Sequence, residues 1–138
     1  IPFLSFVMRA TRQIKVKKRG IDSYWRAVEK AGEVWKKGSP VHIFPEMTRC
    51  SRGFVGTQRF HLAPFKLAIE LKAKIIPVVF FNTDEAWPRG VLKMNRKVVV
   101  RVRSLEAVMA ADYSSSESLM REVKHRIDEA LLGGGVAL

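Results

Sequence analysis

The chain has 138 residues, enough for one domain with a hydrophobic core, and its 47% hydrophobic and 28% charged residues exclude a disordered chain. The net charge of +12 is concentrated in residues 1–39, where ten Lys or Arg face three Asp or Glu, and it favours a phosphate-bearing partner. No apolar run reaches the roughly 18 residues of a membrane-spanning helix, and the single cysteine excludes an internal disulfide.

The N-terminal part of the chain has a short strand and a helix as its predicted elements. Apolar residues 1–8 precede a basic cluster at 9–19, which predicts either an interfacial segment in lipid or a short helix packed on the core. Ile14 and Val16 alternate with lysines, as in a short strand. Asp22 is the predicted N-cap of a helix that Gly38 ends. The apolar positions of this helix follow three- and four-residue spacing: Tyr24, Ala27, Val28, Ala31, Val34 and Trp35.

The middle of the chain alternates between apolar runs and loops. Residues 41–44 lie between two prolines and are typical of a buried strand, whereas residues 46–60 have no periodicity and predict a long loop. A helix is expected from about Leu62 to Lys72. Residues 75–81 (IIPVVFF) form the most strand-like segment, and the proline within it indicates an edge position or a bulge.

The C-terminal part predicts a loop at 82–96, a strand at 97–103 and a long helix. Ser114 and Glu117 have the spacing of a capping box that opens this helix, and the glycines at 133–135 end it. Strands alternating with amphipathic helices predict an α/β fold with a mixed, partly parallel sheet flanked by helices. The residues expected to face inward from the last helix are Leu119, Val123, Ile127, Ala130 and Leu131.

Polar side chains follow the predicted strand 41–44 at once. Glu46, Thr48 and Arg49 stand in one loop at its carboxyl end, with Ser51 and Arg52 shortly after. Ligands bind at this end of strands in open α/β sheets, and the planar guanidinium of arginine suits phosphate. Glu46 is expected either to hold Arg49 or to contact a substrate hydroxyl. A loop stabilised by a Glu46–Arg49 pair, with no ligand, is an equally weighted alternative.

Residues 44–52 (FPEMTRCSR) resemble the third signature block of glycerolipid acyltransferases of the 1-acylglycerol-3-phosphate acyltransferase (phosphatidic-acid-forming) type. Residues 75–79 (IIPVV) resemble the fourth block, and residues 1–5 (IPFLS) resemble an Ile-Pro-x-x-Gly stretch of the family. Lys18 stands where the second block ends in a basic residue. The resemblance implies a glycerolipid acyltransferase-like fold. It further implies that residues 1–138 are the C-terminal portion of a single acyltransferase domain, incomplete at the N-terminus.

The resemblance also implies a reaction and its partners. An acyl chain would pass from acyl-CoA or acyl-carrier protein to the hydroxyl of lysophosphatidic acid, a related lysophospholipid or glycerol phosphate. Such an enzyme works at an anionic membrane surface, peripheral or anchored on its cytoplasmic face. We expect no metal and no cofactor, because metal-ligand spacing and a glycine-rich nucleotide loop are not found in the sequence. The acceptor-site residues implied by position are Lys18, Glu46, Thr48, Arg49 and Pro77.

The catalytic block of the family, His-x-x-x-x-Asp, is not found in the 138 residues. None of His42, His61 and His125 has an aspartate five residues later, so we assign no catalytic residue in this chain and expect the block upstream of Ile1. His42 is predicted to be a core histidine, and His61 is a less remote candidate base. His125 is expected to pair with a neighbour such as Glu129 on a wet helix face.

Other positions depart from the family pattern or leave alternatives open. Met47 replaces a usual glycine, Ser5 a second one, and Cys50 a usual serine. Cys50, beside two arginines, is a candidate low-pKa thiol, although no base is paired with it. A non-catalytic lipid-surface or phosphate-binding module and a pseudoenzyme stay open. Nucleic acid is disfavoured, because the basic segment 9–19 has no aromatic residues on which bases could stack.

Overall fold

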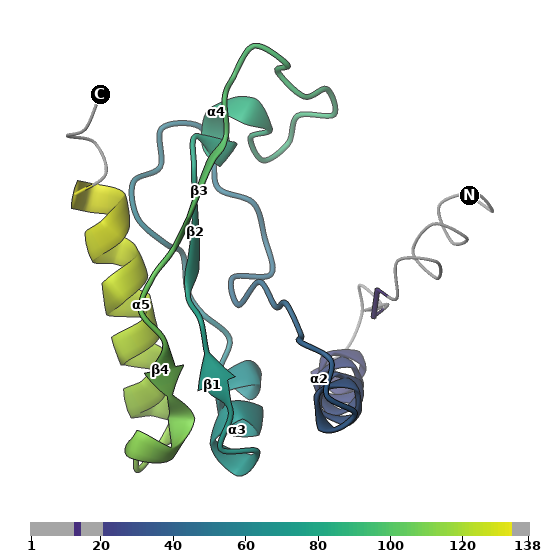
Figure 1. Ribbon diagram of the computed structural model, residues 1–138. Helices are drawn as coiled ribbons and strands as arrows, with labels where there is room; N and C mark the ends of the chain where they lie inside the picture. Colours follow the sequence, from purple (N-terminus) through teal and green to yellow (C-terminus); the bar gives the residue numbers. More distant parts are fainter. Residues whose placement is uncertain (1–12, 15–20, 134–138) are drawn as a thin grey trace. The chain divides into compact units, whose positions relative to one another are not determined.

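The structure, a computed structural model, describes residues 13–14 and 21–133 (Figure 1). The chain divides into two compact units, one within residues 1–43 and the other within residues 44–138, and each is described by itself. Of the strand predicted around residues 14–16, Ile14 has no regular secondary structure and Val16 lies outside the described residues. The apolar segment 1–8 and the acceptor-site candidate Lys18 also lie outside them.

The first unit contains the predicted amphipathic helix, α2 (Ile21–Lys36). It begins before Asp22, which therefore lies in its first turn and is not the N-cap. At its other end Gly38 adopts a left-handed backbone with φ of 82°, and its N–H donates to the carbonyl of Trp35 at 2.8 Å. Glycine takes this conformation without the steric cost of a side chain, so Gly38 ends the helix as predicted.

The buried face of α2 includes Val28 and Ala31, as their spacing predicted, whereas Trp35 is 39% exposed. Residues 41–44 form no strand, although their exposure alternates as in one. A strand needs a hydrogen-bonded neighbour, and none of the strands in the described part of the chain pairs with this segment. His42 is exposed, so the prediction of a core histidine is wrong.

In the second unit, the predicted strand 75–81 is divided into two strands at its proline. Pro77 has no N–H to donate to a ladder, and only its carbonyl is bonded, accepting from the N–H of Leu105 at 2.9 Å. The strands on either side of it therefore turn to different partners. The antiparallel pairs are β1 (Lys74–Ile75) with β4 (Val108–Met109), and β2 (Val78–Phe81) with β3 (Arg101–Ser104).

The prediction of a partly parallel sheet is not supported, because both strand pairs among the described residues are antiparallel. Two of the segments predicted to be strands, at 14–16 and 41–44, form no described strand. The strand predicted at 97–103 begins only at Arg101, and β4 was not predicted because two residues carry no periodicity. The combination of helices with small sheets is that of an α/β chain.

The longest helix of the second unit, α5, runs alongside the two strand pairs (Figure 1). α3 (Ala63–Glu70) has its proline in the first turn as predicted. The last helix, α5 (Ser116–Gly133), is capped by Ser115, whose Oγ accepts the N–H of Ser118 at 3.1 Å. The predicted cap Ser114 is thus one residue too early. Two short helical elements complete the unit: α4 (Thr83–Ala86) and a 3-10 turn, η1 (Ala110–Asp112).

The core of the second unit joins α3, α5 and the β1–β4 pair. Leu119 and Val123 of α5 are 0% and 4% exposed, as their helical spacing predicted. The rings of Phe60 and Phe65 stack with their centroids 6.1 Å apart. Burial of such side chains is the main source of stability of the unit. The other buried members of this core are Ala68, Ala73, Val108 and Ala110.

Candidate functional site

We call residues 46–58 the motif loop, and the carboxylate of Glu46 links its two ends. Its Oε2 accepts the backbone N–H of Gln58 at 2.8 Å and a weak contact from Sγ of Cys50 at 3.8 Å. Glu46 is half-buried, and no ion pair joins it to Arg49 among the described residues. The alternative of a loop stabilised by a Glu46–Arg49 pair is therefore wrong. Glu46 instead brings the two ends of residues 46–58 together.

Arg49 is held by a second segment, residues 82–95, which contains α4 and the loop that follows it. Its Nη1 donates to the carbonyls of Pro88 and Val91 at 3.3 and 3.4 Å, and its Cζ lies 4.2 Å from the centre of the Trp87 ring. The bonds are long, the residue is exposed, and no carboxylate among the described residues neutralises it. The positive charge and the remaining N–H groups of the guanidinium are thus free to bind an anion.

Further backbone contacts tie these two loops together. The N–H of Arg89 donates to the carbonyl of Cys50 at 2.9 Å, and the N–H of Gly53 donates to Oδ2 of Asp84 at 3.0 Å. Within residues 46–58, the side-chain amide of Gln58 donates to the Arg49 carbonyl at 3.2 Å. Sequence analysis predicted a loop at 82–96 but not its contact with Arg49, because about 40 residues separate its backbone carbonyls from Arg49 and no sequence pattern marks them.

A third attachment fastens the motif loop to α5. Asp128 accepts the N–H of Thr57 at 2.7 Å, its hydroxyl at 2.8 Å and the ammonium of Lys124 at 2.7 Å. Burial by itself raises the pKa of Asp128, but the hydrogen bonds from Lys124 and Thr57 outweigh it and lower the pKa below the ordinary 3.8. Gly56 lies close by, and a Cβ built on it would be 3.2 Å from Oδ1 of Asp128. A side chain at position 56 would therefore meet Asp128 in a tight contact, and the φ of 88° at Gly56 also favours glycine.

The remaining predicted acceptor-site residues lie in different surroundings. Thr48 is exposed in the motif loop, with its Oγ1 3.5 Å from the Arg49 carbonyl. Pro77 is buried between β1 and β2. Phe44, which opens the motif, contacts Phe80 of β2 with ring centroids 6.0 Å apart. The structure therefore brings Glu46, Thr48 and Arg49 into one loop, whereas a role of Pro77 at the site stays a prediction.

The three histidines all lie exposed at the surface, and the cysteine is half-buried. His61 is exposed, and it lines a shallow depression with Arg59, Phe60, Leu62, Glu117, Met120 and Lys124. His125 lies 3.5 Å from Glu129, and both side chains are 66% exposed, which confirms the predicted surface pairing. Burial and the negative charge of Glu46 raise the pKa of the Cys50 thiol, so the prediction of a low-pKa thiol is wrong.

Met47, which replaces a glycine of the family pattern, has a backbone conformation that favours glycine. Its φ is 57°, in the left-handed region, where a side chain costs about 1–2 kcal/mol. Its N–H donates to the Phe44 carbonyl at 3.3 Å, so the strain lies at the turn that opens the motif loop. The side chain is 44% exposed. The turn is therefore formed with methionine at this position, but the backbone of Met47 is strained.

This strain predicts a difference between two substitutions at one position. Met47→Gly and Met47→Ala both remove the exposed thioether, but only glycine relieves the left-handed conformation. After allowing for the greater chain entropy of glycine, we expect Met47→Gly to be more stable than Met47→Ala by about 0.5–1 kcal/mol. Urea unfolding midpoints of the two variants measure the difference. Equal midpoints, or a more stable alanine variant, would show that the turn is not strained at this residue.

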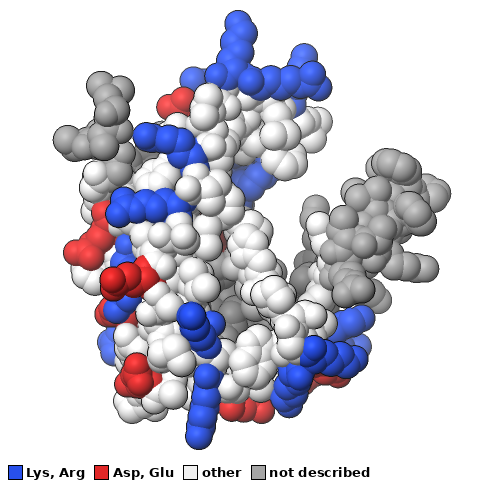
Figure 2. All heavy atoms as spheres, in the orientation of Figure 1, with Lys and Arg blue, Asp and Glu red and all other residues white. Residues whose placement is uncertain are grey.

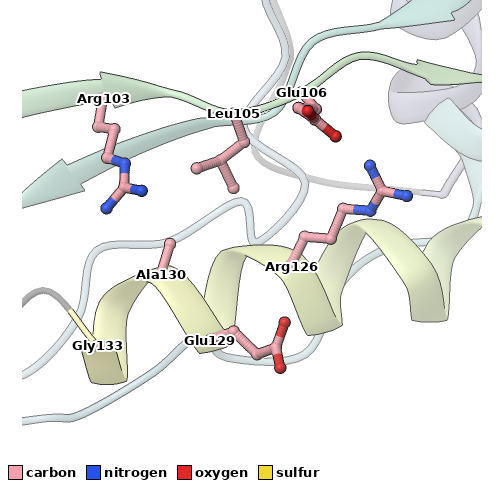
Figure 3. A pocket seen from close by; sticks show the side chains of 7 residues that line it. All are labelled: Arg103, Leu105, Glu106, Arg126, Glu129, Ala130 and Gly133. Atoms are coloured by element: carbon pink, nitrogen blue, oxygen red, sulfur yellow. The ribbon is translucent and has the colours of Figure 1, made fainter.

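A separate groove lies between β3 and α5 (Figure 3). Arg103 and Leu105 extend from the strand side toward α5, which supplies Arg126 and Glu129. Arg126 is already paired through its Nε with Glu122 at 2.6 Å, and the groove holds charges of both signs. None of the described acceptor-site residues (Glu46, Thr48, Arg49 and Pro77) lines it, so we assign it no part in the site. Its other lining residues are Glu106, Ala130 and Gly133.

Comparison with known proteins identifies the family to which the chain belongs. The family model described as Acyltransferase matches residues 1–81, more than half of the chain, and the match includes the whole of the motif loop. The chain belongs to the acyltransferase family. The resemblance inferred from residues 44–52 and 75–79 is thereby confirmed, since both blocks lie within or at the end of the matched range.

Curated relatives agree with this family. The chain is 29% identical over 132 residues to the 1-acyl-sn-glycerol-3-phosphate acyltransferase of Borreliella burgdorferi, covering 95% of this chain and 52% of the relative. It is 24% identical to the chloroplastic 1-acyl-sn-glycerol-3-phosphate acyltransferase of Arabidopsis thaliana, covering 95% of this chain and 35% of that protein. The chain thus spans about half the length, or less, of the curated relatives it matches.

The crystal structure of the 1-acyl-sn-glycerophosphate (LPA) acyltransferase from Thermotoga maritima shares the fold. The TM-score is 0.80 at 21% identity, and the match covers 100% of this chain and 54% of that one. Among residues 13–14 and 21–133 no group of three or more His, Cys, Asp or Glu side chains is arranged to hold a metal ion. Within the same ranges no helix has the length and apolarity that a membrane crossing needs.

Proposed function

We propose that this acyltransferase-family chain forms the acceptor side of an enzyme that acylates lysophosphatidic acid, or a related lysophospholipid or glycerol phosphate. The donor is acyl-CoA or acyl-carrier protein. The observation that carries the proposal is Arg49, an exposed guanidinium with no carboxylate partner among the described residues, held in place by two carbonyls and an indole. A fixed and unneutralised arginine suits the phosphate of such an acceptor.

The loop geometry supports a separate role for each residue of the site. Arg49 binds the acceptor phosphate and so positions the acceptor hydroxyl. Glu46, bonded to the N–H of Gln58 at 2.8 Å, keeps the motif loop in the shape that presents Arg49. Thr48 lies beside it as a further hydroxyl donor. Lys18, outside the described residues, is proposed as a second cation for the phosphate.

Proton transfer is proposed to come from a His-x-x-x-x-Asp segment upstream of Ile1. The histidine removes the proton of the acceptor hydroxyl, whose oxygen attacks the thioester carbonyl. The carbon–sulfur bond then breaks, the ester forms, and the thiolate leaves and is protonated to the free thiol. The aspartate orients the histidine and stabilises its charged form. The enzyme works at the cytoplasmic face of an anionic membrane, where its lipid acceptor dissolves.

An assay of the full-length protein with acyl-CoA and lysophosphatidic acid tests the proposal. We expect release of one free thiol for each ester formed, measured with a thiol reagent and by chromatography of the lipid product. Replacing the upstream histidine by alanine should abolish turnover while leaving the protein folded. Residues 1–138 alone are expected to be inactive, because the acceptor hydroxyl is then not activated. No turnover by the intact protein with any of the named acceptors and donors would overturn the proposal.

A further inference from the structure

The loop after α4 exposes large apolar side chains to solvent. Leu92 is 97% exposed, Met94 is 56% exposed and Val91 is 41% exposed. Most single surface hydrophobic residues need no explanation, but these side chains are neighbours at the tip of one loop. Figure 1 shows that this loop projects from the end of the β2–β3 pair. We call residues 87–97 the tip loop.

The tip loop is also strongly basic. It contains four cations and no carboxylate: Arg89, Lys93, Arg96 and Lys97. The nearest acidic residues along the chain are Glu85 before it and Glu106 after it. Figure 2 shows Lys and Arg side chains gathered at the end of the molecule where Figure 1 places this loop. Apolar side chains surrounded by cations form the pattern of a surface that enters the interface of an anionic bilayer.

Hydrogen bonds at the base hold the tip loop in one shape. The N–H of Asn95 donates to the Ala86 carbonyl at 2.8 Å, which closes the loop, and the indole N–H of Trp87 donates to the Val91 carbonyl at 2.9 Å. The N–H of Lys97 is bonded to Oδ1 of Asn95 at 3.2 Å. The exposed tip is therefore presented by a closed framework, and binding costs little ordering of the backbone.

We propose that the tip loop is a lipid-docking element, which inserts Leu92 and Met94 among the acyl chains of an anionic membrane while its cations lie at the headgroups. Charge complementarity selects this occupant over a neutral protein surface. Nucleic acid fits less well, because the tip side chains are aliphatic and Trp87, the aromatic residue of the loop, is covered on one face by Arg49 at 4.2 Å.

The proposal has a consequence for the acceptor site that rests on the proposed function. The carbonyls of Pro88 and Val91, which hold Arg49, belong to the tip loop. Contact of the tip with lipid would therefore place Arg49 next to the headgroup layer. A lysophospholipid could bind Arg49 through its phosphate without leaving the membrane. The tip loop would thus favour acceptors that are dissolved in lipid.

The test uses the full-length protein with its native cysteines replaced, and a single cysteine introduced by Leu92→Cys and labelled with a polarity-sensitive fluorophore. Leu132→Cys is the matched control, because Leu132 is also an exposed leucine, at 65%. We expect vesicles rich in phosphatidylglycerol to shift the emission of the position-92 label to the blue, and lipid-borne quenchers to quench it. The label at 132 should not respond. The two single-cysteine variants are compared at the same fraction of vesicle-bound protein, so other membrane contacts do not affect the comparison.

Three further measurements separate the possible occupants. Replacing Lys93, Arg96 and Lys97 by glutamine should weaken vesicle partitioning about fivefold for each cation removed, and less in high salt. A label at 92 that stays in water on vesicle-bound protein overturns the proposal. The proposal is also overturned if the label at 92 responds to oligonucleotides, which would indicate a nucleic-acid partner. A response to rising protein concentration without lipid would likewise overturn it and indicate a second copy of the chain. Because the readout is lipid contact, its result is independent of whether acyl transfer is observed.

Discussion

Replacing Arg49 by alanine in the full-length protein is expected to lower kcat/KM for lysophosphatidic acid about 100-fold. A charge-assisted hydrogen bond to phosphate is worth about 1.5–3 kcal/mol, and each 1.4 kcal/mol corresponds to a factor of about ten. Arg49→Lys should recover only part of the loss, because lysine keeps the charge but not the planar fork or the stacking on Trp87. Initial rates at varied acceptor concentration measure the effect.

The acyl donor and a distant arginine are the controls for this experiment. The KM for the acyl donor should not change in Arg49→Ala, since the proposed role concerns the acceptor phosphate alone. Arg121→Ala, on the exposed surface of α5, should leave both constants unchanged. An equal loss for donor and acceptor would indicate that Arg49 serves the fold of the two loops. The role as phosphate ligand would then be wrong.

Replacing Asp128 by alanine is expected to lower the free energy of unfolding by about 2–3 kcal/mol. The side chain is 28% exposed and accepts three hydrogen bonds. Its loss leaves the Thr57 N–H without an acceptor and removes the carboxylate partner of Lys124, which keeps its bonds to Thr57. The same change should loosen residues 46–58 and raise the acceptor KM. Urea unfolding and the acyl-transfer assay measure the two effects. Glu129→Ala breaks an exposed pair and should change stability by less than about 0.5 kcal/mol.

The Asp128 anchor also predicts a dependence on pH. Its pKa in the folded protein is lowered, so its contribution is fully present above the unfolded-state pKa of about 3.9. It is lost as the pH falls through the lower pKa of the folded protein. The difference in stability between the unsubstituted protein and Asp128→Asn should therefore be constant from pH 7 to about 5 and shrink below about pH 4. A difference that persists at pH 2 would indicate that the anchor depends on shape rather than charge.

Elements with a strong local signal were predicted well from the sequence. Helix α2 and the C-terminal helix follow from apolar spacing, because a helix fixes its buried face within a few residues. The caps were less certain: Ser115 rather than Ser114 caps α5, since adjacent serines have equal chemistry and only the backbone path selects one. The strands were predicted less reliably, because a strand exists only where a partner segment pairs with it.

The family of the motif loop could be predicted from the sequence, but its long-range contacts could not. The sequence alone identified residues 44–52 as a signature block of the acyltransferase type, because residue types and spacing carry that information along the chain. It could not indicate that Glu46 bonds Gln58 rather than Arg49, or that residues 82–95 hold the guanidinium. These contacts join backbone groups, which are the same in every residue, across long sequence separations. Only folding brings them together, and it is folding that leaves Arg49 exposed beside a basic, apolar loop.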